Sequence, residues 1–223
     1  MTYRFGFLVF PNLQQLDLTG PYEVFASAKD SAVHLVWKDK NPVRSVTGIN
    51  FTPDVDFEES PQFDVLCIPG GAGVNALLRD EEVLAFIRNQ GEKARFITSV
   101  CTGSLVLGAA GLLKGKRAAT HWNAMDFLPH FGATPVYERV VKDGNLITAG
   151  GVTSGIDFGL SLLSELMGEE EAKIVQLSLE YAPAPPFRSG TPQEAPADVL
   201  QQAKGRIARS RQEREQLVGQ IAQ

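Results

Sequence analysis

Short apolar runs that end abruptly constrain the fold of this chain more than any other feature. The segment Tyr3–Phe10 is dense in apolar and β-prone residues and stops at Pro11, and Asp64–Ile68 and Ala94–Val100 follow the same pattern. Runs that stay apolar without strict alternation are typical of strands buried on both faces of a parallel sheet. The chain therefore predicts several central strands of one such sheet.

Helical segments separate these strands along the chain. We expect further strands at Val33–Trp37 and Val43–Phe51, a hairpin over Val140–Thr148, and helices over Thr19–Lys29 (with Thr19 as its N-cap), Asn75–Gln90, Thr102–Ala110, Ser154–Met167 and Glu169–Glu180. Strands that alternate with helices predict an α/β fold. The expected architecture is a flavodoxin-like, doubly wound, mostly parallel sheet with helices on both faces.

The last forty residues differ in composition from the rest. Five prolines crowd into 183–196, which excludes regular helix or central strand there, and Ala197–Ala222 then spaces apolar residues among charges at helical intervals. We expect an α/β domain over 1–182, followed over 183–223 by a proline-rich strap and an amphipathic helix. That helix packs either on its own core or on a second subunit.

Composition excludes several classes of function. The 223 residues carry 21 Lys and Arg against 26 Asp and Glu, a net charge of −5, which argues against a nucleic-acid-binding protein. No apolar run reaches the roughly 18 residues of a membrane-spanning helix. Two cysteines without a secretion signal are typical of reduced thiols. We therefore expect a cytoplasmic protein that binds neither nucleic acid nor membrane.

The segment Ser99–Gly103 carries the strongest indication of chemistry. A buried strand leads directly to Cys101, and a helix starts at once among small neighbours, a pattern typical of a nucleophile elbow. The N-terminus of a helix favours a thiolate, which is the nucleophilic form of cysteine. The alternative is a small buried core residue, and Cys67, inside an apolar strand, is interpreted in that way.

Two further segments follow predicted strands, at the edge where parallel sheets bind ligands. Asp17 lies between two leucines, and a carboxyl group removed from water has a raised pKa suited to acid–base catalysis. A helix-capping role is the alternative. In Pro69-Gly70-Gly71, the Gly71 N–H is a candidate partner of the Thr102 N–H in an oxyanion hole, although a simple tight turn also explains the glycines.

The histidines give weaker indications. His121 follows Cys101 by twenty residues and is either a base near the thiol or a structural histidine. No cluster of His, Cys, Asp and Glu has the spacing of metal ligands, so we expect no metal.

Taken together, the motifs resemble the ThiJ/PfpI superfamily, which has the class I glutamine-amidotransferase-like fold. The resemblance covers about Tyr3–Glu180. It rests on the order of the segments Phe7–Pro11, Asp17–Pro21, Pro69–Gly71, Ser99–Gly103, Thr120–Trp122 and Ala149–Asp157. Within the superfamily, Asp17 and Thr102 make the chain most similar to the isocyanide hydratase subgroup.

That resemblance implies hydration of an isocyanide to an N-substituted formamide. It implies Cys101 as nucleophile, Asp17 as general acid and base, and Thr102 as a hydrogen-bond partner of Asp17 or of a water. The N–H groups of Gly71, Thr102 and Val152 would support the sulfur or the developing charge, with the Gly150-Gly151 turn bringing the last of them close. Water is the second substrate, no cofactor is needed, and relatives are usually homodimers.

Differences from other branches of the superfamily argue against a protease or a transcription regulator. Protease-like members have histidine directly after the cysteine, where this chain has Thr102. The related transcription regulators continue into a long helix-turn-helix region, and only about forty residues follow Glu180 here. Two alternatives stay open, a cofactor-free glyoxalase or deglycase acting on reactive carbonyls, and a non-catalytic redox sensor based on Cys101.

Overall fold

A seven-stranded sheet forms the centre of the computed structural model, which describes residues 2–221. The strand order is β10-β11-β7-β6-β1-β2-β5, and only the pair β10–β11 is antiparallel. The strands are β1 (Tyr3–Leu8), β2 (Ser31–Trp37), β5 (Val55–Asp56), β6 (Val65–Ile68), β7 (Phe96–Val100), β10 (Val140–Asp143) and β11 (Leu146–Ala149). The mostly parallel sheet and the hairpin at its edge are confirmed.

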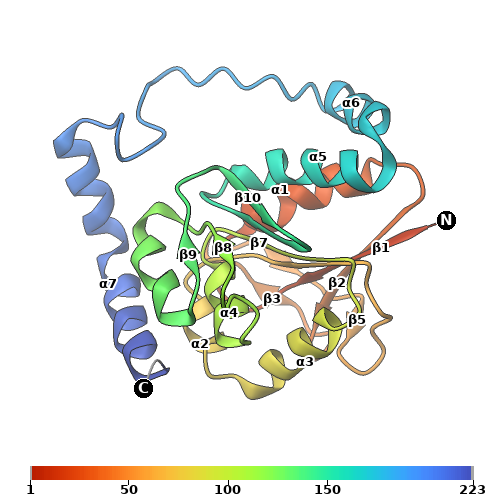
Figure 1. Ribbon diagram of the computed structural model, residues 1–223, viewed down its shortest axis with the longest axis horizontal. Coiled ribbons are helices and arrows are strands. Elements are labelled where there is room, and N and C mark those ends of the chain that lie inside the picture. The colour runs from red at the N-terminus through yellow and green to blue at the C-terminus, as the bar shows by residue number, and fades with distance from the viewer. Residues whose placement is uncertain (1, 222–223) are drawn as a thin grey trace.

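Helices cover both faces of the sheet (Figure 1). One face carries α1 (Gln15–Ala26) and α5 (Ser154–Met167), and α6 (Glu169–Ser178) packs against α5. The other face carries α2 (Val74–Leu77), α3 (Glu81–Gly91) and α4 (Gly103–Ala109). The predicted α/β architecture with two helical layers is therefore confirmed.

The core between the sheet and α1 is built from aromatic side chains. Phe5 and Phe7 of β1 are fully buried, and the Phe5 ring stacks on Phe25 of α1 with centroids 4.3 Å apart. Burying a phenylalanine contributes roughly 1.5–3 kcal/mol. On the opposite face of β1, a Cβ at Gly6 would lie 2.3 Å from the Phe63 ring, so this position admits only glycine.

The first helix starts earlier than predicted. We expected Thr19 to cap it, but α1 begins at Gln15 with Gln14 at the N-cap position, and the Thr19 hydroxyl donates inside the helix to the Gln15 carbonyl (3.1 Å). Inside a helix, a threonine hydroxyl can donate to the carbonyl four residues earlier, although N-cap positions suit threonine better. The shift matters because it places Asp17 inside the first turn.

The expected helix over Asn75–Gln90 is divided in two. Helix α2 ends at Leu77, and α3 starts at Glu81 after the Asp80 carboxylate accepts a hydrogen bond from the Val83 N–H (3.3 Å). An aspartate that caps a new helix competes with continuation of the old one.

The predicted strand over Val43–Phe51 is a small hairpin. It consists of β3 (Val43–Arg44) and β4 (Asn50–Phe51), which turn at Gly48 with φ +94°. A second small pair, β8 (Arg117–Ala118) with β9 (Thr134–Pro135), flanks the 3₁₀ helix η1 (Trp122–Phe131).

The C-terminal segment lies over the same chain. Residues 182–196, called the strap here, run as extended and turn structure, mostly exposed, from α6 to α7 (Ala197–Ile221) (Figure 1). Helix α7 packs on η1 and α2, so in this single chain the first of the two expected arrangements is observed. The predicted helix end at Ala222 lies outside the described residues. Within residues 2–221, no helix is both long and apolar enough to cross a membrane.

Candidate active site

Cys101 occupies a tight turn between β7 and α4. Its φ is +56°, a left-handed conformation that is uncommon outside glycine, and its side chain is buried. The Cys101 N–H donates to the Ala149 carbonyl (3.0 Å), and the Thr120 hydroxyl donates to the Cys101 carbonyl (2.9 Å). A Cβ at Gly103 would lie 2.0 Å from the Ile68 carbonyl oxygen, so glycine permits the close approach of helix and strand. The predicted strand–cysteine–helix turn is present.

Asp17 lies in the first turn of α1, with none of its surface exposed. The Gly70 N–H donates to its Oδ2 (2.9 Å), whereas Oδ1 has no hydrogen-bond partner among the described residues. Because Gln14 holds the N-cap position, Asp17 does not act as the helix cap that we considered. A buried carboxyl oxygen without a partner is costly, which points to a role other than folding.

Burial raises the pKa of Asp17 to about 7. The Gly70 N–H and the Cys101 thiol both favour the carboxylate and lower this pKa, but they do not offset the loss of solvation. At neutral pH the Asp17 carboxyl group therefore exists in both protonation states, as acid–base catalysis requires.

The pKa of the Cys101 thiol is raised well above its usual range. Burial is the main cause, the negative charge of Asp17 adds to it, and the Thr102 N–H and the positive charge of Arg214 oppose it. We expected the helix N-terminus to favour a thiolate, and the Thr102 N–H does lower the pKa of Cys101. The N-terminal N–H acts in the predicted direction, but burial and Asp17 outweigh it.

The loop after β6 joins these groups. The Gly71 N–H, which we expected in an oxyanion hole, instead donates to the Thr102 hydroxyl oxygen (3.1 Å). No hydrogen bond joins that hydroxyl directly to Asp17 within residues 2–221. A Cβ at Gly70 would lie 2.6 Å from the Thr102 nitrogen and 2.8 Å from Asp17 Oδ2. Gly70 thus allows the backbone to approach both groups, a role that we had not assigned to it.

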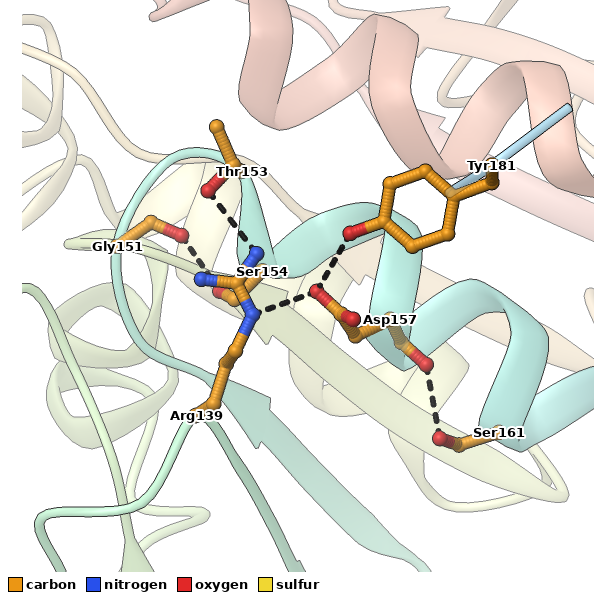
Figure 2. A network of polar contacts seen from close by, with 7 residues as sticks. All are labelled: Arg139, Gly151, Thr153, Ser154, Asp157, Ser161 and Tyr181. Carbon is orange, nitrogen blue, oxygen red and sulfur yellow. Dashed lines mark hydrogen bonds and ion pairs between the residues drawn. The ribbon is translucent and has the colours of Figure 1, made fainter. Parts of the chain in front are cut away.

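A polar network braces the turn after β11 (Figure 2). The Arg139 Nε donates to Asp157 Oδ2 (2.6 Å), its Nη2 donates to the Thr153 hydroxyl (3.0 Å), and the Tyr181 hydroxyl donates to Asp157 Oδ2 (3.1 Å). This network ties the residue before β10, the N-terminal part of α5 and Tyr181, the residue before the strap, to one another.

The braced turn contains the predicted backbone groups. The Gly150 N–H donates to the Arg139 carbonyl (3.0 Å), and the Gly151 carbonyl accepts from the Ser154 N–H and hydroxyl. No hydrogen bond to a described residue uses the Val152 N–H, which leaves it available to a ligand.

His121 lies at the start of η1, with Nδ1 accepting a hydrogen bond from the Asn123 N–H (3.3 Å). Burial, with a smaller effect of the positive charge of Arg214, lowers its pKa to about 4. His121 is therefore neutral at physiological pH. Cys67, fully buried in β6, has its thiol pKa raised by burial to about 12, which agrees with its interpretation as a core residue.

A cleft of about 980 Å³ opens beside these groups, between η1, the turn after β11 and α7. Thr120, His121, Gly150, Gly151 and Val152 line its inner side. Cys101 and Asp17 are buried and are not among its lining residues. Among the described residues, no group of His, Cys, Asp and Glu side chains is arranged to hold a metal ion.

Sequence reasoning missed Arg214 of α7, which is buried and acts electrostatically on Cys101 and His121. An indication was available. Leu200, Ile207, Arg214 and Ile221 follow one another at seven-residue intervals, so the arginine takes a place in the apolar stripe of the helix.

Known proteins resemble this chain in sequence and in fold. Isonitrile hydratase of Pseudomonas putida is 60% identical over 94% of this chain and 92% of its own length. The crystal structure of a ThiJ/PfpI family protein from Pseudomonas syringae is 42% identical, has a TM-score of 0.95, and matches 98% of this chain and 91% of that chain. The crystal structure of Drosophila melanogaster DJ-1beta is 26% identical, with a TM-score of 0.75 over 82% of this chain and 100% of that chain.

The family model of the DJ-1/PfpI family matches residues 4–165, which contain Asp17, the Gly70–Gly71 loop, Cys101 and the turn after β11. The resemblance inferred from the motifs is confirmed. The chain belongs to the DJ-1/PfpI family.

Proposed function

We propose that this protein is an isocyanide hydratase, which converts an isocyanide and water to an N-substituted formamide. The likeness to isonitrile hydratase of Pseudomonas putida carries the choice of substrate. The buried pair of Cys101 and Asp17 supplies a nucleophile and an acid–base group that suit this reaction.

The first step forms a covalent intermediate. The pair of Cys101 and Asp17 carries one proton, and the reactive form has the proton on Asp17 and the negative charge on the sulfur. The sulfur attacks the terminal carbon of the isocyanide, and Asp17 donates its proton to the same carbon. The product is a thioimidate, and Asp17 is left as a carboxylate.

The second step uses water. The Asp17 carboxylate accepts a proton from water as the hydroxide adds to the thioimidate carbon, and Asp17 then passes that proton to the nitrogen. The tetrahedral intermediate collapses, the carbon–sulfur bond breaks, and the hydroxyl proton returns to the pair of Asp17 and Cys101. The formamide leaves and the starting state is restored. A pKa of about 7 suits a carboxyl group that acts first as acid and then as base.

Neighbouring groups support these steps in the proposal. The Thr102 hydroxyl and the Gly71 N–H form one hydrogen-bonded unit beside Asp17, which orients the proton transfers. The Thr102 N–H stabilises negative charge on the sulfur. The Val152 N–H, with Gly151 in the same turn, is assigned to the charge that develops on the intermediate. Substrate approaches through the cleft, past His121 and Gly150.

Turnover of a small aryl isocyanide by the purified protein tests the proposal, with formamide formation followed by absorbance. Cys101→Ala should abolish turnover, because the other free cysteine, Cys67, is confined to the core. Cys67→Ser is the matched control and should retain turnover. Formamide production by Cys101→Ala at the wild-type rate would refute the mechanism.

The two alternatives are addressed by related measurements. Turnover of methylglyoxal with none of the isocyanide would indicate the carbonyl-directed enzyme. A sensor thiol is accessible and has a lowered pKa, whereas Cys101 is 6% exposed with a raised pKa, which favours the enzyme.

The proposal extends to the organisation of the protein. We propose that 1–182 form the catalytic domain, that 183–223 form an appendage, and that the protein is a cytoplasmic homodimer. Exposed apolar side chains on α6 and the strap (Ile174, Leu177 and Phe187) supply a surface for the partner, and the free thiols suit a reducing compartment. Light scattering that gives the mass of one chain would contradict the dimer.

A further inference from the structure

Helix α7 buries a positive charge without an acidic partner. The Arg214 side chain lies in the stripe of α7 that faces η1 and α2, and Arg214 is 6% exposed. Its Nε donates to Asn75 Oδ1 (2.9 Å) and its Nη2 to the Ser210 hydroxyl (3.4 Å). No carboxylate within residues 2–221 forms an ion pair with it, whereas Arg209 and Arg211 of the same helix pair with Glu213 and Asp126.

Such an arrangement costs free energy. Buried guanidinium groups are ordinarily paired with carboxylates, because neutral partners do not replace the lost hydration of the charge. Burial accordingly lowers the pKa of Arg214 from its usual value. An apolar residue would fill the same stripe without this cost, so packing does not explain an arginine at this position.

The contacts of Arg214 lead to the catalytic loop. Asn75, which holds the guanidinium, lies on α2, four residues after Gly71, and its Nδ2 donates to the Ser210 carbonyl (3.0 Å). Helix α2 packs on both α7 and α4, and α4 starts directly after Cys101 and Thr102. Asn75 therefore connects the C-terminal helix to the loop that carries the hydrogen bonds of Asp17 and Thr102.

The charged and titratable groups around Arg214 are few. The charges of Arg211 and Glu213 on its own helix, and of Cys101 in the domain, shift the pKa of Arg214. It also acts on His121, whose pKa of about 4 leaves it neutral at physiological pH. Arg214 is the one cation among the groups that shift the pKa of Cys101, and it acts against burial and Asp17.

We propose that Arg214 is a positioning residue that holds positive charge near Cys101 and stabilises the sulfur whenever it is anionic. The sulfur carries negative charge before its attack and again when the carbon–sulfur bond breaks, so the charge serves both steps of the proposed hydratase reaction, on which its catalytic benefit rests. Residue 214 lies outside the segment matched by the family model, 4–165, so this contribution comes from the C-terminal helix.

The test measures the reactivity of the Cys101 thiol as a function of pH. Alkylation of Cys101 by iodoacetamide is followed against pH, with mass spectrometry to separate it from alkylation of Cys67. Arg214→Gln retains hydrogen bonding but removes the charge, and Arg214→Lys retains the charge. Arg209→Met removes an exposed charge from the same helix and serves as the matched control.

We expect Arg214→Gln to raise the apparent pKa of alkylation by about one unit, which slows alkylation about tenfold at a fixed pH below that pKa. Arg214→Lys should recover at least half of this shift, and Arg209→Met should match the wild type. Identical pH profiles for Arg214→Gln and wild type would overturn the proposal. Equal shifts in Arg214→Gln and Arg214→Lys would also overturn it, because packing rather than charge would then be responsible.

The alkylation assay needs no isocyanide. If the profile shifts as expected while the wild type fails to hydrate isocyanides, the hydratase proposal fails and the role of Arg214 stands. If the wild type does hydrate isocyanides, Arg214→Gln should lower kcat/KM about tenfold and Arg214→Lys should recover part of the loss.

Discussion

Replacing Asp17 by asparagine should abolish turnover and, at and above pH 7, stabilise the protein. Asparagine retains an oxygen that can accept the Gly70 N–H but has no charge to bury. The pKa of Asp17 is raised in the folded state, so the folded protein binds this proton more tightly than the unfolded chain does. Its contribution to stability is therefore fully present below the unfolded value and is lost as pH rises through the folded value.

The magnitude follows from the two pKa values. Raising the pKa from 3.8 to about 7 is a shift of about 3 units, and each unit corresponds to about 1.4 kcal/mol. Ionised Asp17 thus destabilises the wild type by about 4 kcal/mol at most above pH 7. The asparagine variant escapes this penalty, so its advantage should grow between pH 4 and pH 8.

Urea denaturation of both proteins at pH 4.5, 6, 7 and 8 measures this effect. The difference in the free energy of unfolding should increase with pH and level off near pH 8. The same pair of measurements in a Cys101→Ser background shows how much of the effect depends on the thiol. A difference that stays constant from pH 4.5 to pH 8 would refute the raised pKa and, with it, the acid–base role.

Two further substitutions separate the site from the core. Gly70→Ala should lower the free energy of unfolding by about 1–3 kcal/mol and turnover at least tenfold, because its Cβ would lie within 2.8 Å of both Thr102 and Asp17. Denaturation and formamide assays that match the wild type would contradict this. Cys67→Ser should lower stability by about 1–3 kcal/mol, since it buries a hydroxyl in an apolar strand, while kcat stays within twofold of the wild type. Loss of turnover without loss of stability would contradict the core interpretation.

The central sheet was predictable because its strands are buried on both faces. Such strands are long apolar runs that few other structures accommodate, and the small residues around Cys101 mark the turn after one of them. The boundaries of α1 and α3 were less predictable. Thr19 and Asp80 both have the side chains of helix caps, and only the surrounding packing decides that the first lies inside a helix and the second starts one.

The pKa shifts of the site residues could not be predicted without the three-dimensional structure. The local sequence around Cys101 indicates a helix N-terminus, which lowers the pKa of a thiol. It does not reveal that the thiol is buried or that Asp17 lies close to it, and these two effects raise the pKa of Cys101. Asp17 and Arg214 are about two hundred residues apart in sequence and influence the same sulfur. Local patterns do not reveal such long-range effects.

The strap makes docking of α7 an intramolecular reaction. Its 15 residues reach about 50 Å at most when fully extended, and a tether of this kind holds the helix at an effective concentration near the millimolar range. A docking surface too weak to retain a separate peptide is then sufficient. During evolution, the helix and the charged residue that it carries can therefore be substituted without any change in the strands that position the nucleophile.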